Sequence, residues 1–312
     1  MIKIIRGLHN LPRPPCRCVA TIGNFDGVHL GHQAVLSQLA TKADMLGLPA
    51  VVITFEPQPY EYFVPEKAPA RLSRFREKVE ALRAYSIQKL CVLRFNEQLA
   101  SMSAQTFIES LLVSGLQVAY LVVGDDFRFG YQRQGDFAML QAAGKQHGFQ
   151  VVNMHTFGVD DMRVSSTRIR QALQASQLKL AEKLLGRPYR MSGRVAHGDK
   201  RGRQMGFPTA NIHLHRYKVP LRGVYAVQLF GIDGEPVMGV ANIGIRPTIG
   251  GNKALLEVHL LDFDRDIYGA HVQVVFLQKI RDEQKFGDLS ALMHQIEQDC
   301  EAAREYFTHC PA

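Results

Sequence analysis

The chain has 312 residues, 46% hydrophobic and 21% charged, which is typical of a globular protein long enough for two domains. The first residues lack the long apolar core of a secretory signal, and Glu109 and Gly115 divide the most apolar window, 100–124, so we expect a cytoplasmic protein without a membrane span. The net charge is +8, and residues 187–222 include nine basic residues and one acid, which indicates a polyanionic partner, either nucleic acid or a nucleotide polyphosphate.

The five cysteines are expected to be reduced thiols, because their number is odd and no C-x-x-C pair is present.

Near-continuous apolar runs alternate with helical stretches through the first half of the chain. Such runs are typical of parallel strands that are buried on both faces. We therefore predict an α/β fold, an open, Rossmann-like parallel sheet with its ligand at the carboxyl ends of the strands. The expected strands are residues 19–22, 50–55, 89–95, 118–124 and 149–155.

The first motif, GNFDGVHLGH at 23–32, connects the first of these strands to a predicted helix. Glycines let the backbone approach a ligand, and free N–H groups at a helix N-terminus bind phosphate. His29 and His32 project from one face of that helix and can stabilise charge on a phosphoanhydride, although a metal pair or a plain surface turn is the alternative. The two histidines are therefore the candidate catalytic residues, and the candidate phosphate-binding residues are Gly23, Phe25, Asp26, Gly27 and Gly31.

Two more motifs occur in the same half. RVSSTRIR at 163–170 opens another helix, where hydroxyls can cap the N-terminus and arginines can bind phosphate, although helix capping alone also explains the serines. GDDFRFG at 124–130 places acids and aromatics at the carboxyl end of a strand. Two helix N-termini at one sheet edge can hold a triphosphate between them. The candidate phosphate-binding residues here are Arg163, Ser165, Ser166, Thr167 and Arg168.

The periodicity changes after a helix at 165–189, which ends at Gly186-Arg187-Pro188, so we predict domains at 1–186 and 187–312. Period-two strands and Gly-rich turns then predict a small antiparallel β-barrel. An amphipathic helix at 288–307 is expected to pack against the barrel. The expected strands are residues 223–230, 236–244, 254–263 and 271–280.

The basic segment contains GDKRGRQMGFPTANI at 198–212. Its glycines and basic residues predict a flexible loop, but not a Walker loop, because no Gly-Lys-Ser/Thr ends it. Thr209 and Asn211 share one side of a short extended run, and their oxygens suit Mg²⁺ beside a nucleotide phosphate. A basic surface loop is the alternative. The candidate nucleotide-binding residues of the segment are Gly198, Lys200, Gly206 and Pro208.

GNFDGVHLGH, GDDFRFG and SSTRIR, in this order, resemble the adenylyltransferase domain of prokaryotic bifunctional FAD synthetases, which are H-x-G-H nucleotidyltransferases. The resemblance implies transfer of AMP from ATP to the phosphate of FMN, with release of pyrophosphate. It implies that His29 and His32 stabilise the transferring phosphoryl group, that Arg163 and Ser166 hold the ATP phosphates, and that Asp126 and Phe127 lie near the flavin. The family usually has His where this chain has Gln58.

GFPTAN, GVYAV, NIGIRPT, LEVHLLDF and IYG resemble the riboflavin kinase domain of the same proteins. The resemblance implies phosphorylation of riboflavin to FMN, with Thr209 and Asn211 binding Mg-ATP and the loop around Lys200 closing over the nucleotide. Glu257, by pattern alone a solvent-facing strand acid, would accept the proton of the terminal ribityl hydroxyl. Arg281 would contact the flavin.

Two other interpretations stay open at this stage. The H-x-G-H signature also occurs in tRNA-charging adenylate-forming enzymes, but their Lys-Met-Ser-Lys-Ser loop is missing here. The basic segment is also typical of an RNA-binding protein, but Tyr189, Phe207 and Tyr217 do not form a base-stacking series. We expect riboflavin, FMN, FAD and ATP as ligands, Mg²⁺ with the ATP, and neither nucleic acid nor a membrane as partner, while the oligomeric state stays open.

Overall fold

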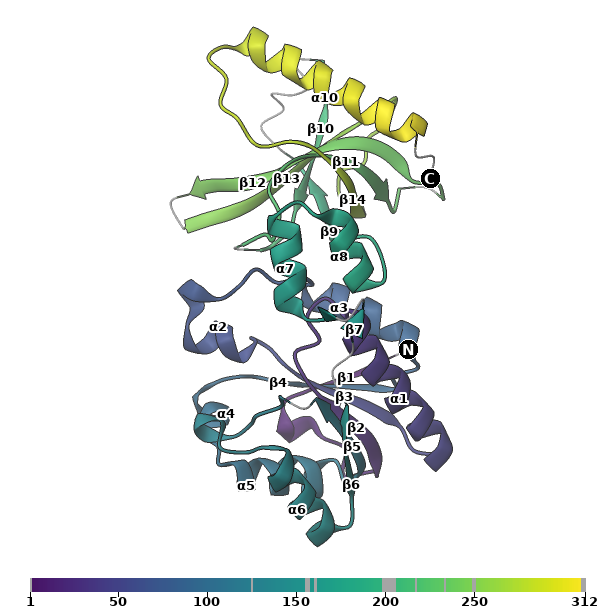
Figure 1. Ribbon diagram of the computed structural model, residues 1–312, viewed down its shortest axis with the longest axis vertical. Coiled ribbons are helices and arrows are strands. Elements are labelled where there is room, and N and C mark those ends of the chain that lie inside the picture. The colour runs from purple at the N-terminus through teal and green to yellow at the C-terminus, as the bar shows by residue number, and fades with distance from the viewer. Residues whose placement is uncertain are drawn as a thin grey trace. The chain divides into compact units, whose positions relative to one another are not determined.

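A computed structural model describes residues 2–124, 126–154, 158–159, 162–197, 206–216, 218–232, 234–248 and 251–309. The chain forms two compact units (Figure 1). The first consists of Met1–Ala68 and Arg74–Ser165, and the second of Pro69–Ser73 and Ser166–Ala312. The described residues contain no helix that is both long and apolar enough to cross a membrane.

The first unit contains the predicted open parallel sheet. Its order is β1-β4-β3-β2-β5-β6, and every neighbouring pair is parallel. The chain moves from β2 outward through β3 and β4 and then returns to place β5 on the other side of β2. The sheet has one edge strand more than expected, β1. The strands are β1 (Lys3–Arg6), β2 (Cys18–Ile22), β3 (Ala50–Phe55), β4 (Lys89–Leu93), β5 (Val118–Gly124) and β6 (Gln150–Met154).

Helices cover both faces of this sheet because successive strand residues enter two different cores. Val52 and Leu90 pack with α1 and α3 on one face, whereas Ile53 and Cys91 pack with α5 and the following π-helix on the other. The helices are α1 (Leu30–Leu46), α2 (Pro59–Phe63), α3 (Phe75–Leu82), α4 (Glu97–Ala100), α5 (Ala104–Phe107), the π-helix η4 (Ile108–Gly115) and α6 (Phe137–His147). Short elements complete the unit: η1 (Leu8–Asn10), η2 (Pro65–Lys67), η3 (Arg83–Tyr85), η5 (Tyr131–Arg133), β7 (Gly158–Val159) and β8 (Met162–Arg163).

The second unit contains the predicted antiparallel barrel and terminal helix. The barrel is closed, with the order β10-β13-β12-β11-β14-β9. The single helix expected at 165–189 is two helices, because Ser176 adopts a left-handed conformation (φ +57°) between them. The functional boundary at residue 186 stays a prediction. The elements are α7 (Ser166–Gln174), α8 (Leu178–Leu185), β9 (Arg190–Ala196), β10 (Thr209–His213), β11 (Gly223–Phe230), β12 (Val237–Thr248), β13 (Gly251–Leu260), β14 (His271–Arg281) and α10 (Leu289–His309).

Helix α10 lies against the outer face of the barrel (Figure 1). Its Ala303 and Phe307 pack on Val224 and Val240 of the barrel strands. A bidentate ion pair joins the two parts, since the Arg281 guanidinium donates to both Asp299 carboxylate oxygens at 2.8 and 2.7 Å. The Asp299 side chain is only 4% exposed, so its charge depends on this partner.

Replacing Arg281 by Met should therefore destabilise the second unit by about 3–5 kcal/mol, because it leaves a buried carboxylate without its cation. Urea unfolding of the full chain measures the loss. The matched control is Arg304→Met. Arg304 lies on the same helix as Asp299, and the substitution breaks its bidentate pair with Asp262. That pair is 49% and 78% exposed, so the control should lose much less stability than Arg281→Met. Equal losses in the two variants would contradict this account.

Candidate active sites

The loop after β2 leaves the first sheet where the strand order reverses. Strands β3 and β5 lie on opposite sides of β2, so the carboxyl ends of β2 and β5 flank a crevice at the usual ligand position of open α/β sheets. The backbone there is strained, because Phe25 and Val28 adopt φ of +49° and +43° although neither is glycine. Gly27 is also left-handed, at +83°. Strain of this kind concentrates at ligand-binding loops.

The two motif histidines stack at the start of α1. Their ring centroids are 3.6 Å apart and the ring planes differ by 17°. His29 is the N-cap residue, and its Nδ1 accepts a hydrogen bond from the backbone N–H of His32 at 3.3 Å. Nε2 therefore carries the proton of the neutral His29 ring and can donate. Gly31 makes the stack possible, because a Cβ there would lie 3.3 Å from the His29 ring.

Burial keeps the second imidazole neutral. It lowers the pKa of His32 well below its usual value of 6.5, and His29 and Lys78 lower this pKa further. The His32 Nδ1 is buried and has no hydrogen-bond partner among the described residues. Lys78 is itself fully buried, with Nζ 3.4 Å from the Thr54 hydroxyl. The site therefore presents one neutral imidazole, that of His32, stacked on the His29 ring and close to a buried lysine.

The structure brings some of the other candidate residues of the first half of the chain into contact with one another. Phe25 and Asp26 are buried in the loop, and Gly23 lies beside the Phe25 ring. Arg163 donates to the Asp126 carboxylate at 2.5 Å, in a pair that is 53% and 70% exposed. Phe127 stacks on Phe129. Ser165 ends the first unit, whereas Ser166, Thr167 and Arg168 begin α7 in the second, so their grouping with the histidines stays a prediction.

Two candidate kinase residues, Asn211 and Glu257, lie in a row across three barrel strands. Glu257 of β13 lies directly opposite Asn211 of β10 on one side and Asn242 of β12 on the other. Directly opposed residues project from the same face of a sheet. Here this is the outer face, because Val224 continues the row from Asn242 and packs against α10. The neighbours of Glu257 along β13, Leu256 and Val258, are fully buried on the opposite face.

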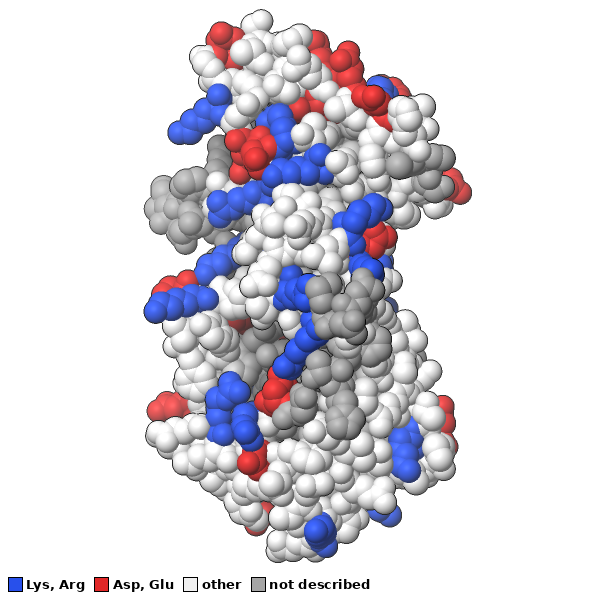
Figure 2. Space-filling view, in the orientation of Figure 1, with Lys and Arg blue, Asp and Glu red and all other residues white. Residues whose placement is uncertain are grey.

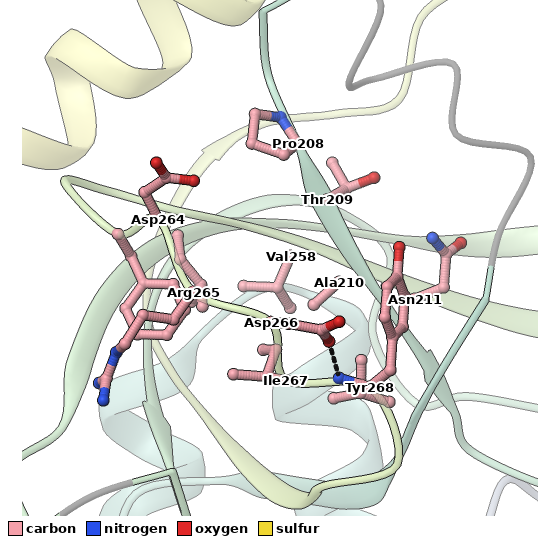
Figure 3. A pocket seen from close by; sticks show the side chains of 13 residues that line it. Pro208, Thr209, Ala210, Asn211, Val258, Asp264, Arg265, Asp266, Ile267 and Tyr268 are labelled. Carbon is pink, nitrogen blue, oxygen red and sulfur yellow. Dashed lines mark hydrogen bonds between the residues drawn. The ribbon is translucent and has the colours of Figure 1, made fainter.

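A cavity of about 340 Å³ opens beside this row at β10 (Figure 3). Pro208, Thr209 and Asn211 line one part of it, and Asp264 and Arg265 lie on the opposite side. The Pro208 carbonyl accepts a hydrogen bond from His259 Nδ1 at 2.9 Å, which holds the start of β10 against β13. Gly206 is exposed and left-handed, at φ +85°. Gly198 and Lys200 lie outside the described residues.

Comparison with known proteins identifies the family. The FAD synthetase family model matches residues 11–168, and the riboflavin kinase model matches residues 185–307. The "Bifunctional riboflavin kinase/FMN adenylyltransferase" of Escherichia coli K12 is 52% identical over 98% of both chains. That of Haemophilus influenzae is 53% identical over 98% of this chain and 99% of the relative. The chain belongs to this bifunctional family.

Two more proteins are similar over almost the whole chain. The Pseudomonas fluorescens protein of the same name is 54% identical over 97% of each chain. The crystal structure titled "Macrolide-efflux Protein" from Streptococcus pneumoniae is 32% identical, with a TM-score of 0.81 over 97% of this chain and 99% of that one.

Gln58 stands where the family usually has histidine, and it has a local structural role. It is the N-cap residue of α2, and its backbone N–H donates to the Glu61 carboxylate at 2.8 Å. The helix that follows presents an aromatic surface that the sequence interpretation missed. Tyr62 and Phe63 are 38% and 62% exposed, and both rings lie 5.5 Å from that of Phe95. Three aromatics within PYEYF are the sequence signal for it.

The sequence interpretation also missed Lys78, although the pattern of α3 indicates that this lysine is buried. Lys78 shares the buried face of the helix with Val79 and Leu82. A lysine on an apolar helix face is rarely buried without a specific role. Arg281 was expected to contact flavin, and in the structure its guanidinium binds Asp299 and the Asp282 carbonyl. That flavin contact stays a prediction.

On the face in Figure 2, Lys and Arg residues lie over both units, and Asp and Glu residues are interspersed among them.

The neutral His32 predicts a pH-dependent stability of the first unit. The unfolded state binds the proton below pH 6.5 and the folded state does not, so stability is full above that pH and is lost as the pH falls toward the folded pKa. Between pH 7.5 and 5.5 the loss should reach about 1.4 kcal/mol. Hydrogen exchange of the α1 amides at the two pH values measures it. His32→Gln should lose less than the parent, and identical losses would contradict the assignment.

Proposed function

We propose that this chain makes FAD from riboflavin in two ATP-dependent steps. The second unit phosphorylates riboflavin to FMN, and the first unit adenylylates FMN to FAD with release of pyrophosphate. The observation that carries the proposal is that relatives named as bifunctional are 52% and 53% identical over 98% of this chain. The two other interpretations of the sequence, tRNA charging and RNA binding, have no comparable support.

Adenylyl transfer needs positioning rather than a covalent nucleophile. An oxygen of the FMN phosphate attacks the α-phosphorus of ATP in line, and the bond to the β-phosphate oxygen breaks. His29 and His32 are proposed to stabilise the charge that develops during this exchange, with backbone N–H groups between Gly23 and Gly31 close to the phosphates. Thiol chemistry does not compete there, since burial raises the pKa of Cys18 and Cys91 to about 12.

The arginine of the third motif is proposed to bind the ATP phosphates. Arg163 pairs with Asp126 through an exposed contact, which costs little to open. When Arg163 turns to the triphosphate, Asp126 becomes available to the flavin beside Phe127. Ser165, Ser166, Thr167 and Arg168 are proposed to supply further donors to the same phosphates.

An aromatic surface is proposed to bind the flavin ring for adenylylation. Tyr62 and Phe63 follow β3, and Phe95 follows β4, at the sheet edge where ligands of this fold bind. A flat isoalloxazine ring can stack on such exposed aromatic faces.

In the second unit, Glu257 is proposed to take the proton from the terminal ribityl hydroxyl. The hydroxyl oxygen then attacks the γ-phosphorus of ATP, and ADP leaves. The nucleotide is proposed to occupy the cavity beside Thr209 and Asn211, with the loop at Gly198 and Lys200 over its phosphates. The adjoining Gly206 and Pro208 would lead that loop into β10.

The donor set fits Mg²⁺ that arrives with ATP. Thr209 and Asn211 offer two neutral oxygens on one face, and no cluster of three or more His, Cys, Asp or Glu residues able to hold a metal occurs among the described residues. Mg²⁺ commonly takes few protein ligands and completes its shell with phosphates and water. Bound there, it would neutralise phosphate charge. Since both steps consume ATP, and the described cysteines are free thiols, we place the enzyme in the cytoplasm.

Two substitutions separate the activities. His29→Ala should reduce FAD formation from FMN and ATP by about 10²–10³-fold while leaving riboflavin phosphorylation intact, because one transition-state donor is lost. Glu257→Gln should reduce FMN formation by about 10²–10⁴-fold while supplied FMN is still converted to FAD, because the general base is lost. Chromatography of flavins after incubation with riboflavin, Mg²⁺ and ATP measures both. Loss of both products from either folded variant would refute separate sites.

Phe63→Ala should raise the KM for FMN in adenylylation about tenfold or more, as expected for a lost aromatic stacking contact. The control is Tyr131→Ala, which removes another exposed aromatic of the same unit, 48% exposed. Steady-state kinetics at saturating ATP distinguishes them. An unchanged KM in Phe63→Ala would exclude this surface as the flavin site.

A further inference from the structure

Asn242 occupies a position equivalent to that of Asn211 on the other side of Glu257. The strand order β10-β13-β12 places Glu257 between the two asparagines, and all three side chains share the outer face of the barrel. Of these three residues, Asn211 lines the cavity that contains Thr209, whereas Glu257 and Asn242 do not. Asn242 therefore lies on the side of the candidate base away from the proposed nucleotide.

The carboxamide oxygen of Asn242 is buried and has no hydrogen-bond partner among the described residues. A buried acceptor without a donor costs about 1–3 kcal/mol, so such an atom needs a reason. Two neighbouring side chains on the same face are apolar and cannot donate a hydrogen bond to it. Val224, opposite on β11, is apolar, and Val240, two residues along β12, also packs under α10.

Two charged side chains among the described residues nearby have other contacts. The carboxylate of Glu283 occupies the space above Gly244, two residues along β12 from Asn242, where a Cβ would overlap it. Arg281, which continues the row on β14, has its guanidinium bound to Asp299 and to the Asp282 carbonyl. A ligand that contacts Asn242 and Glu257 together must therefore supply the donors. A chain of hydroxyl groups has this property.

We propose that Asn242 Oδ1 accepts a hydrogen bond from a secondary hydroxyl of the ribityl chain, while Glu257 accepts the proton of the terminal hydroxyl. This rests on the proposed kinase activity. Opposed strand residues have Cβ atoms about 4.5–5.5 Å apart, a spacing that lets neighbouring hydroxyls of one polyol reach both side chains. Asn242 thus selects a polyol substrate and aligns its terminal hydroxyl with the base.

The test is steady-state riboflavin phosphorylation by the full chain. Asn242→Ala should raise the KM for riboflavin about tenfold, the effect of one hydrogen bond, with the KM for ATP and the Mg²⁺ requirement unchanged. Asn242→Ser, which keeps an acceptor, should recover part of the loss. The matched control is Asn153→Ala, which removes another buried oxygen without a described partner, on β6 of the first unit, and should leave riboflavin phosphorylation unchanged.

Riboflavin analogues that lack one secondary hydroxyl test the contact without a variant. One analogue should lose about tenfold in kcat/KM with the parent protein and nothing further with Asn242→Ala. A normal riboflavin KM in Asn242→Ala, or a raised Mg²⁺ requirement instead, would overturn the inference while the kinase activity stands. Absence of FMN from the parent protein would overturn the proposed function itself, and this inference with it.

Discussion

Backbone hydrogen bonding between strands positions both candidate sites. In the first unit, parallel pairing on both sides of β2 makes the loops after Ile22 and Gly124 leave the same edge of the sheet. In the second, antiparallel pairing aligns Asn211, Glu257 and Asn242 across three strands. A slip of one residue would turn each of these side chains to the opposite face. The positions of the candidate residues therefore depend on the register that backbone pairing sets between the strands.

In the proposed function, the two units use different groups for the same triphosphate chemistry. The first offers a strained loop, backbone N–H groups and two stacked imidazoles, one of which burial keeps neutral. Neutral donors avoid the cost of holding a buried charge before the substrate arrives. Lys78 adds a buried cation nearby. The second unit offers uncharged oxygens beside a carboxylate, a set that suits a metal-bound nucleotide on one side and an alcohol on the other.

Helix α10 links the stability of the barrel to its candidate site. The Arg281–Asp299 pair fixes the helix to β14, and the apolar contacts of Ala303 and Phe307 cover the barrel next to Val224. Because Val224 belongs to the same row as Asn242, this packing keeps water from one end of the row. Exclusion of water there strengthens the polar interactions of the buried Asn242 oxygen with any donor that reaches it.

Local patterns determined the fold class. Continuous apolar runs, as in β3 and β5, predict parallel strands that are buried on both faces. Alternation of apolar and polar residues predicts the barrel strands, because only one face of such a strand is buried. The H-x-G-H turn and Glu257 were likewise found by motif. Only the tertiary structure revealed the edge strand β1, the break between two helices at Ser176, and the asparagines that lie opposite Glu257 on the neighbouring strands. A strand of four residues such as β1 and an isolated asparagine are too short to show a periodic signal, and their register and burial depend on residues distant in the chain.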